Sequence, residues 1–404
     1  MTGPQNIVID ARWITPTPSG IGVYTREIIR RLPALEPAWR WHLLFRDPVL
    51  RDDVIADCGF AGNPKVTTEI LPYGLFSPVG QLKLPKLLRK LKCDIFHSTN
   101  FMVPYFAFGT FGTLLGADPP VNKGCGVSVV NIHDAIPLLL RQYAPRSKTS
   151  RMLWFYRDCL KAAIRCSAAT ITGSKTSKHD IAAALDLDRQ LTDSISVVYD
   201  GVSGRFSPAP EGTVRKPGDA QIILYVGRLD PYKNVPMLVD AFAMLRHRTD
   251  SPLHLMVVGP YDARYPEARN HARDRGIAGD VTFLHDASDA DLLEAYRNAS
   301  VLVNPSRYEG FGLPMLEAMK CGIPVICADG GSQREVSGGA AEVVPPGDEP
   351  ALIAALERVL FDDALRAAMT EKGLARAAEF TWETTARETL AVYHQALEQA
   401  GRFK

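Results

Sequence analysis

The segment Gly227–Asn234 brings two cations to the start of a predicted helix. Arg228 and Lys233 bracket the turn that follows a strand-like run, Gln221–Gly227. A guanidinium group there can fork onto one phosphate while an ammonium group acts as a point charge, so together they can hold a diphosphate without a metal ion. Alone, this segment is better explained as a loop with two solvated cations.

A second segment, Asn304–Glu317, carries two carboxylates around a glycine-rich turn and gives the strongest signal in the chain. The strand-like run Val301–Val303 leads into the turn Gly310–Gly312. Glu309 precedes this turn, and Glu317 lies one helical turn inside the helix that follows. Two carboxylates at this separation are not placed like the acid/base pair of a glycosidase. They suit hydrogen bonds to two separate diols of one ligand.

Two glycines stand at a comparable position in the first half of the chain. Gly20 and Gly22 follow the strand-like run Ile7–Ile9 and precede a helical pattern that starts near Val23. Glycines allow a close backbone approach, and the N-terminus of a helix favours an anion. Because any tight turn can use two glycines, this feature is weak by itself.

Two histidines end strand-like runs of the first half. His133, followed by Asp134, ends Val127–Ile132, and His97 ends Cys93–Phe96. Each histidine can either reach a ligand beyond the end of its strand or be satisfied inside the fold with no part in catalysis. Both interpretations stay open here for each histidine.

The elements that position these residues alternate regularly between strand and helix. Such alternation predicts an α/β protein with two parallel sheets, each covered by helices on both faces and each forming a Rossmann-like domain. The segment Asp200–Ala220 is rich in proline and glycine and is interpreted as a linker. We therefore expect a first domain over 1–200, a second over 201–381, and a last helix in 382–404 that returns to the first domain.

Several motifs together resemble one enzyme family. They are Glu309–Gly310–Phe311–Gly312–Leu313–Pro314 with Glu317–Ala318–Met319, Gly322 with Pro324–Val325–Ile326, Gly227–Arg228–Leu229 with Lys233–Asn234, Asp200–Gly201–Val202 with Phe206 and Pro208, Ser332 with Glu335–Val336, and Phe380–Thr381–Trp382. The region from Glu309 to Glu317 resembles the E-x7-E region of the retaining glycosyltransferases of family 4, which have the two-domain GT-B architecture. The resemblance covers most of residues 5–395 and is looser in the first half.

This resemblance implies the activity. It implies transfer of a hexosyl group from a nucleotide-sugar, bound by the second domain, to a glycan or lipid-linked glycan acceptor in cell-surface polysaccharide synthesis. The active site would lie in the cleft between the domains. The anomeric configuration would be retained by front-face attack, with the departing phosphate taking the acceptor's proton. A looser likeness to bacterial mannosyltransferases of polysaccharide and O-antigen synthesis makes GDP-mannose the first candidate donor, although the residues do not distinguish a guanine from a uracil pocket.

The resemblance also implies a role for each candidate residue. Arg228 and Lys233 would hold the diphosphate, Glu317 would bind the ribose hydroxyls, and Glu309 would bind the donor sugar. The backbone amides of Gly310, Phe311, Gly312 and Leu313 would line the sugar and phosphate, and the Gly20 to Gly22 loop would cover the diphosphate. A histidine would reach the donor sugar, His133 before His97, and Asp134 would orient His133 or contact the acceptor hydroxyl.

No cofactor is expected, because the nucleotide-sugar is a substrate. Two D-x-D pairs, Asp186/Asp188 and Asp289/Asp291, have the spacing of a metal site. The first lies in a polar connector after a helix, and Asp289 is interpreted as the N-cap of a helix over Ala290–Asn298. Since neither pair follows a strand, we expect metal-independent catalysis.

The charge of the chain is divided unevenly. Residues 1–190 carry 24 Lys+Arg and 15 Asp+Glu, whereas residues 191–404 carry 22 and 30. This division indicates an anionic partner for the first half or compositional drift between two domains. The segment Gly80–Lys92 places Leu84, Leu87, Leu88 and Leu91 at helical spacing among five cations. Such a helix either lies on an anionic bilayer or buries its leucines in the core.

Two further segments are candidates for the acceptor side. Phe101–Ala117 is free of charge and rich in aromatic residues, and Arg141, Arg146, Lys148 and Arg151 add positive charge. We expect them to meet a lipid-linked diphosphate or a glycan. No nucleic-acid-binding module accompanies the charge, so nucleic acid is a poor alternative.

The cysteines and the N-terminal residues indicate where the protein resides. Seven scattered cysteines without C-x-x-C spacing, no evident secretory signal and no spanning apolar run predict a cytoplasmic protein, with contact to the inner face of the cell membrane as a further expectation.

Three other functions stay open. A nucleotide-sugar epimerase of the same shape would convert donor without an acceptor, and a non-catalytic sugar-nucleotide-binding protein would need no His133. An NAD-dependent dehydrogenase is weaker, because G-x-G-x-x-G is absent after the first strand.

Overall fold

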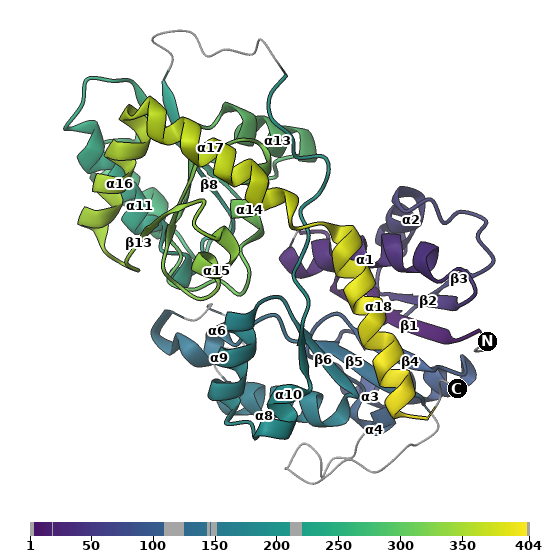
Figure 1. The fold of residues 1–404 in the computed structure, drawn as a ribbon. Helices are drawn as coiled ribbons and strands as arrows, with labels where there is room; N and C mark the ends of the chain where they lie inside the picture. Colours follow the sequence, from purple (N-terminus) through teal and green to yellow (C-terminus); the bar gives the residue numbers. More distant parts are fainter. Residues whose placement is uncertain are drawn as a thin grey trace. The chain divides into compact units, whose positions relative to one another are not determined.

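The computed structural model describes residues 4–17, 19–108, 125–143, 146, 152–210 and 220–401. The chain forms two compact units, shown as ribbons in Figure 1. The first unit comprises Met1–Ala135, Met152–Asp200 and Trp382–Lys404, and the second comprises Ile136–Arg151 and Gly201–Thr381.

The first unit is built on a parallel sheet. Among the described residues it has seven strands in the order β3-β2-β1-β4-β5-β6-β7. Their bounds are β1 Asn6–Asp10, β2 Arg40–Phe45, β3 Val66–Ile70, β4 Ile95–Ser98, β5 Val127–Asn131, β6 Ala169–Thr172 and β7 Ile195–Val197. The strand order reverses at β1, which pairs with β2 on one side and β4 on the other. Ligands of such sheets bind at the carboxyl ends of the strands beside this reversal.

Helices cover the sheet of the first unit. They are α1 Gly20–Leu35, α2 Pro48–Asp57, α3 Pro78–Lys90, α4 Tyr105–Phe108, α8 Leu153–Cys166, α9 Lys175–Leu185, α10 Arg189–Asp193 and α18 Trp382–Gln399, with a short 3-10 helix at Ala11–Trp13. Figure 1 shows the C-terminal helix α18 lying against α1. The Arg31 guanidinium of α1 donates to Glu383 of α18 at 2.8 Å.

The basic helix α3 turns its leucines inward. Leu84 and Leu88 are 3% and 0% exposed, and Leu87 and Leu91 pack against the same apolar cluster. Of the two interpretations of this segment, the structure therefore has the one in which the leucines enter the core, because burying them there removes apolar area from water. The leucine face is not available to a bilayer.

The second unit is built on another parallel sheet. Its six strands within the described ranges have the order β10-β9-β8-β11-β12-β13. They are β8 Gln221–Val226, β9 Leu253–Val258, β10 Val281–Leu284, β11 Val301–Asn304, β12 Val325–Ala328 and β13 Glu342–Val344. The order reverses between β8 and β11, where Ile223 pairs with Val301 and Leu224 with Leu302. The loops that follow these two strands are therefore neighbours.

The helices of the second unit pack on one another and on its sheet. Its longer helices are α11 Val235–Arg246, α12 Glu267–Asp274, α13 Asp289–Asn298, α14 Leu313–Lys320, α16 Glu349–Phe361 and α17 Asp363–Ala378, and its shorter ones are α6 Ile136–Leu139, α15 Gln333–Ser337 and the 3-10 turns Arg141–Tyr143, Pro231–Lys233 and Ala278–Asp280. Helix α11 packs with α12 and α16, and α14 packs with α17. Both units thus have helices packed on a parallel sheet.

Residues 136–151 belong to the second unit, whereas the expected domain bounds placed them in the first. Arg146 explains this difference. Its backbone N–H donates to the Tyr265 hydroxyl at 2.7 Å, and its guanidinium pairs with Glu267. Arg146 is therefore engaged by α12 and its preceding loop. Lys148, Arg151 and residues 109–117 of the predicted acceptor loop lie outside the described residues.

No helix in the described part of the chain is both long enough and apolar enough to cross a membrane.

Candidate active site

Lys233 and Glu309 form the centre of the candidate site in the second unit. They come from the loops after β8 and β11, the two strands beside the reversal of strand order. The Lys233 Nζ donates to Glu309 Oε1 at 2.7 Å and to Oε2 at 2.8 Å. Their side chains are only 17% and 10% exposed. Burial alone would lower the pKa of Lys233, but the adjacent charge of Glu309 outweighs it and raises that pKa. Lys233 is therefore charged at neutral pH.

The Glu309 backbone is held by the loop that follows β12. The Glu309 carbonyl accepts from the Ser332 backbone N–H at 2.9 Å and from its hydroxyl at 3.0 Å. Gly331 has φ +65°, which favours glycine, and a side chain on Gly330 would meet the Arg307 carbonyl oxygen at 2.3 Å. These contacts fix the position from which the Glu309 side chain reaches Lys233.

The Gly310–Gly312 turn leads directly into α14. Gly312 has φ +99° and stands at the N-cap of the helix without a side-chain cap. The first amides of α14 therefore have no side-chain acceptor at this cap among the described residues, and such amides can bind an anion or a hydroxyl oxygen. Leu313 is the first residue of the helix.

Arg228 lies on the same loop as Lys233 but has a different partner. Its Nε lies 3.0 Å from Asp230 Oδ2, with the Arg228 side chain 51% exposed and the Asp230 side chain 2% exposed. The backbone of this loop is tightly packed, because a Cβ on Gly259 would lie 2.0 Å from the Gly227 carbonyl oxygen. The Arg228 guanidinium is thus held by Asp230 while about half of the side chain remains open to solvent.

Glu317 contacts neither Lys233 nor Arg228 among the hydrogen bonds of the described residues. Its Oε2 accepts from the Tyr296 hydroxyl of α13 at 2.6 Å. Desolvation raises the pKa of Glu317, and the hydrogen bond from Tyr296 opposes that rise. Tyr296 was not predicted from the sequence. Its position within α13 matches that of a core residue, and no sequence signal pairs it with Glu317.

His133 lies in the first unit, after β5. Its Nε2 donates to the Thr99 carbonyl at 3.0 Å, and its ring meets the Tyr24 ring edge-on with centroids 5.3 Å apart. His133 and Asp134 are both partly exposed. Because Nε2 carries the donated proton, Nδ1 is the ring nitrogen left for a further contact.

His97 is a core residue, so its prediction as a ligand-contacting histidine is wrong. It lies inside β4 and is 0% exposed. Its Nδ1 accepts from the Tyr393 hydroxyl at 2.5 Å, and its Nε2 donates to Asn131 Oδ1 at 2.6 Å. Burial lowers the pKa of His97 to about 4. A neutral imidazole with both nitrogens engaged has no group left for a substrate.

Asp200, the last residue of the segment Met152–Asp200 of the first unit, has a buried carboxyl group. Asp200 was not singled out as a site residue from the sequence. It is 7% exposed, and its Oδ1 has no hydrogen-bond partner in the part of the chain that the structure describes. Burial raises the pKa of Asp200 to about 6, with His133 acting in the opposite direction. Asp200 therefore adds a titratable group to the surroundings of His133.

Gly20 and Gly22 form the first turn of α1 and not a loop before it. The Ser19 hydroxyl accepts from the Gly22 N–H at 3.1 Å and so starts the helix three residues earlier than expected. A Cβ on Gly20 would meet nothing within 4 Å. The surface at Gly20 therefore remains open to a ligand.

Residues of both D-x-D pairs take part in the ends of helices. Asp186 ends α9 in a left-handed conformation, and Asp188 caps α10 by accepting from the Leu191 N–H at 2.8 Å. The N-cap of α13 is Ser288 and not Asp289 as predicted, because Ser288 and Asp291 form a reciprocal capping box.

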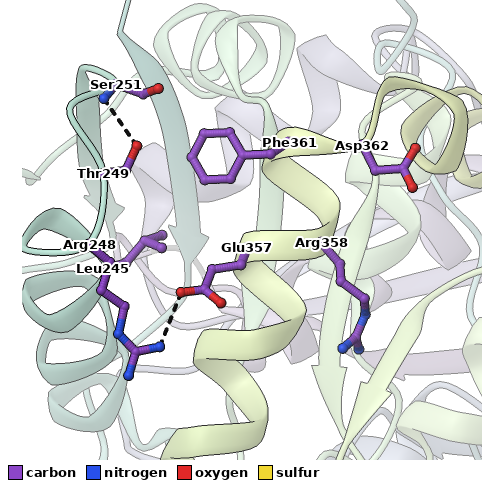
Figure 2. Close-up of a pocket in the computed structure, with 8 residues that line it drawn as sticks. All are labelled: Leu245, Arg248, Thr249, Ser251, Glu357, Arg358, Phe361 and Asp362. Carbon is purple, nitrogen blue, oxygen red and sulfur yellow. Dashed lines mark hydrogen bonds and ion pairs between the residues drawn. The ribbon is translucent and has the colours of Figure 1, made fainter.

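Two hollows of the second unit lie at different places. One of about 530 Å³ opens between the end of α11 and the end of α16, where Arg248 pairs with Glu357 at 3.1 Å beside Phe361 (Figure 2). It lies near the amino end of β9, away from the loops that carry Lys233 and Glu309. A smaller one of about 160 Å³ adjoins the Lys233 loop and is lined by Asn234 and Tyr265. The smaller hollow is the one beside the candidate site.

Comparisons with known proteins identify the class. A model described as "Glycosyltransferase Family 4" matches residues 18–203, and one described as "Glycosyl transferases group 1" matches residues 211–376. The chain therefore belongs to the glycosyltransferases of GT-B fold, which confirms both the predicted family resemblance and the predicted pair of Rossmann-like domains.

Individual relatives extend this result over the whole chain. The chain is 27% identical over 389 residues to the O-antigen chain mannosyltransferase B of Escherichia coli, covering 93% of this chain and 96% of that protein. Sucrose-phosphate synthase from Thermosynechococcus elongatus has the same fold, with a TM-score of 0.71 at 21% identity, covering 98% and 100% of the two chains. The Anabaena protein HepE, solved with UDP and glucose, superposes with a TM-score of 0.71 at 18% identity, covering 96% and 98%.

Proposed function

We propose that this glycosyltransferase moves a mannosyl group from GDP-mannose to a glycan or lipid-linked glycan, with retention of configuration and without a metal ion. The observation that carries the proposal is the contact between Lys233 and Glu309 where the strand order reverses. The donor assignment is supported by the likeness to an O-antigen mannosyltransferase along nearly the whole chain.

The charges of the site define how it would act. Arg228 and Lys233 would meet the negative charge that develops as the diphosphate leaves, and preorganised charges of this kind stabilise a transition state. Glu309 would hold sugar hydroxyls. Because both of its oxygens accept from Lys233, its carboxylate is poorly suited to attack the anomeric carbon. This supports front-face attack, in which the departing phosphate takes the acceptor's proton and positioning lowers the barrier.

His133 is the histidine that would contact the donor sugar. Its Nε2–H is committed to the Thr99 carbonyl, so Nδ1 would face a sugar hydroxyl. Asp134 would orient His133 or contact the acceptor hydroxyl. Replacing His133 by alanine would then lower kcat more than donor affinity, whereas full activity of His133→Ala would contradict this role for His133. Binding of GDP-mannose by wild type without transfer to any acceptor would indicate a protein that only binds sugar nucleotides.

Transfer itself is tested with GDP-mannose and octyl mannoside as the acceptor probe, in excess EDTA. We expect a disaccharide whose new linkage has the anomeric configuration of the donor, measured by NMR. An inverted product would contradict retention, and use of UDP-sugars alone would contradict the donor assignment. Conversion of the donor to another sugar nucleotide without acceptor would indicate an epimerase.

We also propose that the acceptor is reached at an anionic membrane, through the outer face of α3. Lys83, Lys86, Arg89 and Lys90 are exposed on this face. Next to them Phe76, Val79 and Leu82 are 56%, 43% and 64% exposed. Exposed apolar side chains beside a row of cations suit the headgroup region of a bilayer that contains anionic lipid.

The membrane contact is tested by co-sedimentation with vesicles. Vesicles containing phosphatidylglycerol should pellet the protein, and vesicles of phosphatidylcholine alone should not. Lys83→Glu/Lys86→Glu should abolish pelleting, while the matched pair Arg248→Glu/Arg358→Glu on the second unit should not. Equal pelleting by both vesicle types, or no pelleting, would contradict the proposal.

A further inference from the structure

Tyr296 stands behind one of the two carboxylates of the candidate site. It belongs to α13, is 0% exposed, and donates its hydroxyl to Glu317 Oε2 at 2.6 Å. Burial raises the pKa of Tyr296 well above its ordinary value, and the charge of Glu317 raises it further. The phenol therefore remains a proton donor at any physiological pH.

The hydrogen bond from Tyr296 makes the two oxygens of the Glu317 carboxylate different. Oε2 is engaged by Tyr296, whereas Oε1 accepts no hydrogen bond from the described residues, and the Glu317 side chain is partly exposed. A glutamate side chain on a helix surface has several rotatable bonds, and fixing them costs conformational entropy when a ligand binds. The hydrogen bond to Oε2 already restricts the Glu317 side chain in the free protein, so less entropy is lost on binding. Oε1 is therefore preorganised to accept from hydroxyl groups.

The Tyr296 ring is itself held by the segment that precedes the second sheet. The Phe206 ring meets the Tyr296 ring edge-on, with centroids 5.4 Å apart and an angle of 86°. The Arg205 guanidinium lies 4.8 Å from the centroid of the Phe206 ring and is paired with Asp289 at the start of α13. Two consecutive residues of the 201–210 segment thus fix the helix and the ring that carry the hydroxyl.

We propose that Tyr296 is a positioning residue that holds Glu317 ready for the vicinal diol of a ribonucleoside diphosphate, and so contributes to discrimination against deoxyribonucleotides. The inference rests on the proposed function, since it assumes that a nucleotide-sugar binds this unit. Tyr296 does not touch the nucleotide. It acts by fixing the orientation of the carboxylate and by favouring its charged form.

The test compares GDP with 2′,3′-dideoxy-GDP by calorimetric titration of the full chain in EDTA. Wild type should bind GDP more tightly than the dideoxy nucleotide. Tyr296→Phe should weaken GDP binding about ten-fold, as expected for losing a hydrogen bond to a charged group, and leave the dideoxy nucleotide unaffected. In the Glu317→Gln background, Tyr296→Phe should change neither affinity.

Tyr105→Phe is the matched control, because it removes another buried tyrosine hydroxyl, the one that donates to the Cys159 carbonyl of the first unit at 3.1 Å. It should change neither affinity. Equal weakening of both nucleotides by Tyr296→Phe would show a merely structural role and overturn the inference, as would unchanged GDP binding. If wild type binds neither GDP nor UDP, the proposed function itself fails.

Discussion

Removing the Lys233 ammonium group is expected to destabilise the second unit strongly. Its Nζ lies 2.7 and 2.8 Å from the two oxygens of Glu309. With the side chains 17% and 10% exposed, Lys233→Met would leave a buried carboxylate without its partner. Breaking such a pair costs about 3–5 kcal/mol, and Glu309→Gln should cost a similar amount. The double variant Lys233→Met/Glu309→Gln should lose much less than the sum, because neither charge remains.

The assay must follow the second unit specifically. All five tryptophans, Trp13, Trp39, Trp41, Trp154 and Trp382, lie in the first unit, so tryptophan fluorescence reports only on that unit. Differential scanning calorimetry, combined with hydrogen exchange of 301–320, follows the other one. A coupling energy of at least about 2 kcal/mol between Lys233 and Glu309 is expected. Additive losses below about 1 kcal/mol each would refute the reasoning, because exposed ion pairs behave in that way.

The pH dependence of the same pair has a definite sign. The pKa of Lys233 is raised above 10.5 in the folded protein. Its contribution to stability is therefore fully present below the unfolded pKa and is lost as the pH rises through the folded pKa. Wild type should lose this stability only above about pH 10.5, and Lys233→Met should not show that loss.

Other predictions concern buried groups and a packed glycine. Ionisation of Asp200, whose pKa is about 6 in the fold against 3.8 ordinarily, destabilises the first unit above pH 6 by up to about 3 kcal/mol. Asp200→Asn should therefore raise the unfolding midpoint measured by tryptophan fluorescence at pH 8 and have little effect near pH 4. His97 affects stability in the opposite direction. Because its pKa is lowered to about 4 in the fold, the free energy of unfolding falls by about 3 kcal/mol as the pH decreases from 6.5 to 4. These two contributions to the pH dependence of stability oppose each other in wild type, so Asp200→Asn should reveal the acid sensitivity due to His97. If the unfolding midpoint of Asp200→Asn depends on pH below 6.5 as that of wild type does, this reasoning is contradicted. Gly259→Ala should destabilise the second unit by more than about 2 kcal/mol in calorimetry, because its Cβ would lie 2.0 Å from the Gly227 carbonyl oxygen, whereas Gly279→Ala, with nothing within 4 Å, should be nearly neutral. Equal effects of these two substitutions would contradict the packing argument.

The strands that flank the site could be predicted from the sequence. β8 spans Gln221–Val226 against the predicted run Gln221–Gly227, and β11 spans Val301–Asn304 against the predicted run Val301–Val303. Each is a short apolar run that the sequence pattern locates to within one residue. β2 was not predicted, since Arg40 and His42 interrupt its apolar pattern while it pairs with β1 and β3. β7 and β13 have three residues each, which is too short for a periodic pattern.

The error over His97 has a physical cause. β4 spans Ile95–Ser98 and not Cys93–Phe96, so the histidine lies within the strand. Its hydrogen-bond partners are Asn131 and Tyr393, the latter 296 residues away. Local apolar patterning carries no information about such partners, and a histidine inside a strand therefore looks like one just beyond it.

For the candidate site, residue types were predictable and partners were not. Motif spacing singled out Lys233 and Glu309 separately, and the strand order that joins β8 to β11 brings them together. The anchors of Arg228 and Glu317, which are Asp230 and Tyr296, depend on side-chain packing. Only Asp230, placed between the two cations of one loop, had a sequence signal that could have indicated its role.

We propose that the second unit binds a nucleotide-sugar through Arg228 and Lys233 without a divalent cation. Calorimetric titration of GDP-mannose into the full chain in excess EDTA is the decisive measurement. We expect saturable one-to-one binding that is lost in Arg228→Ala, a variant of a half-exposed side chain that should leave the fold intact. Absence of binding in wild type, or binding that requires added Mn²⁺, would contradict a metal-independent nucleotide-sugar site in this unit.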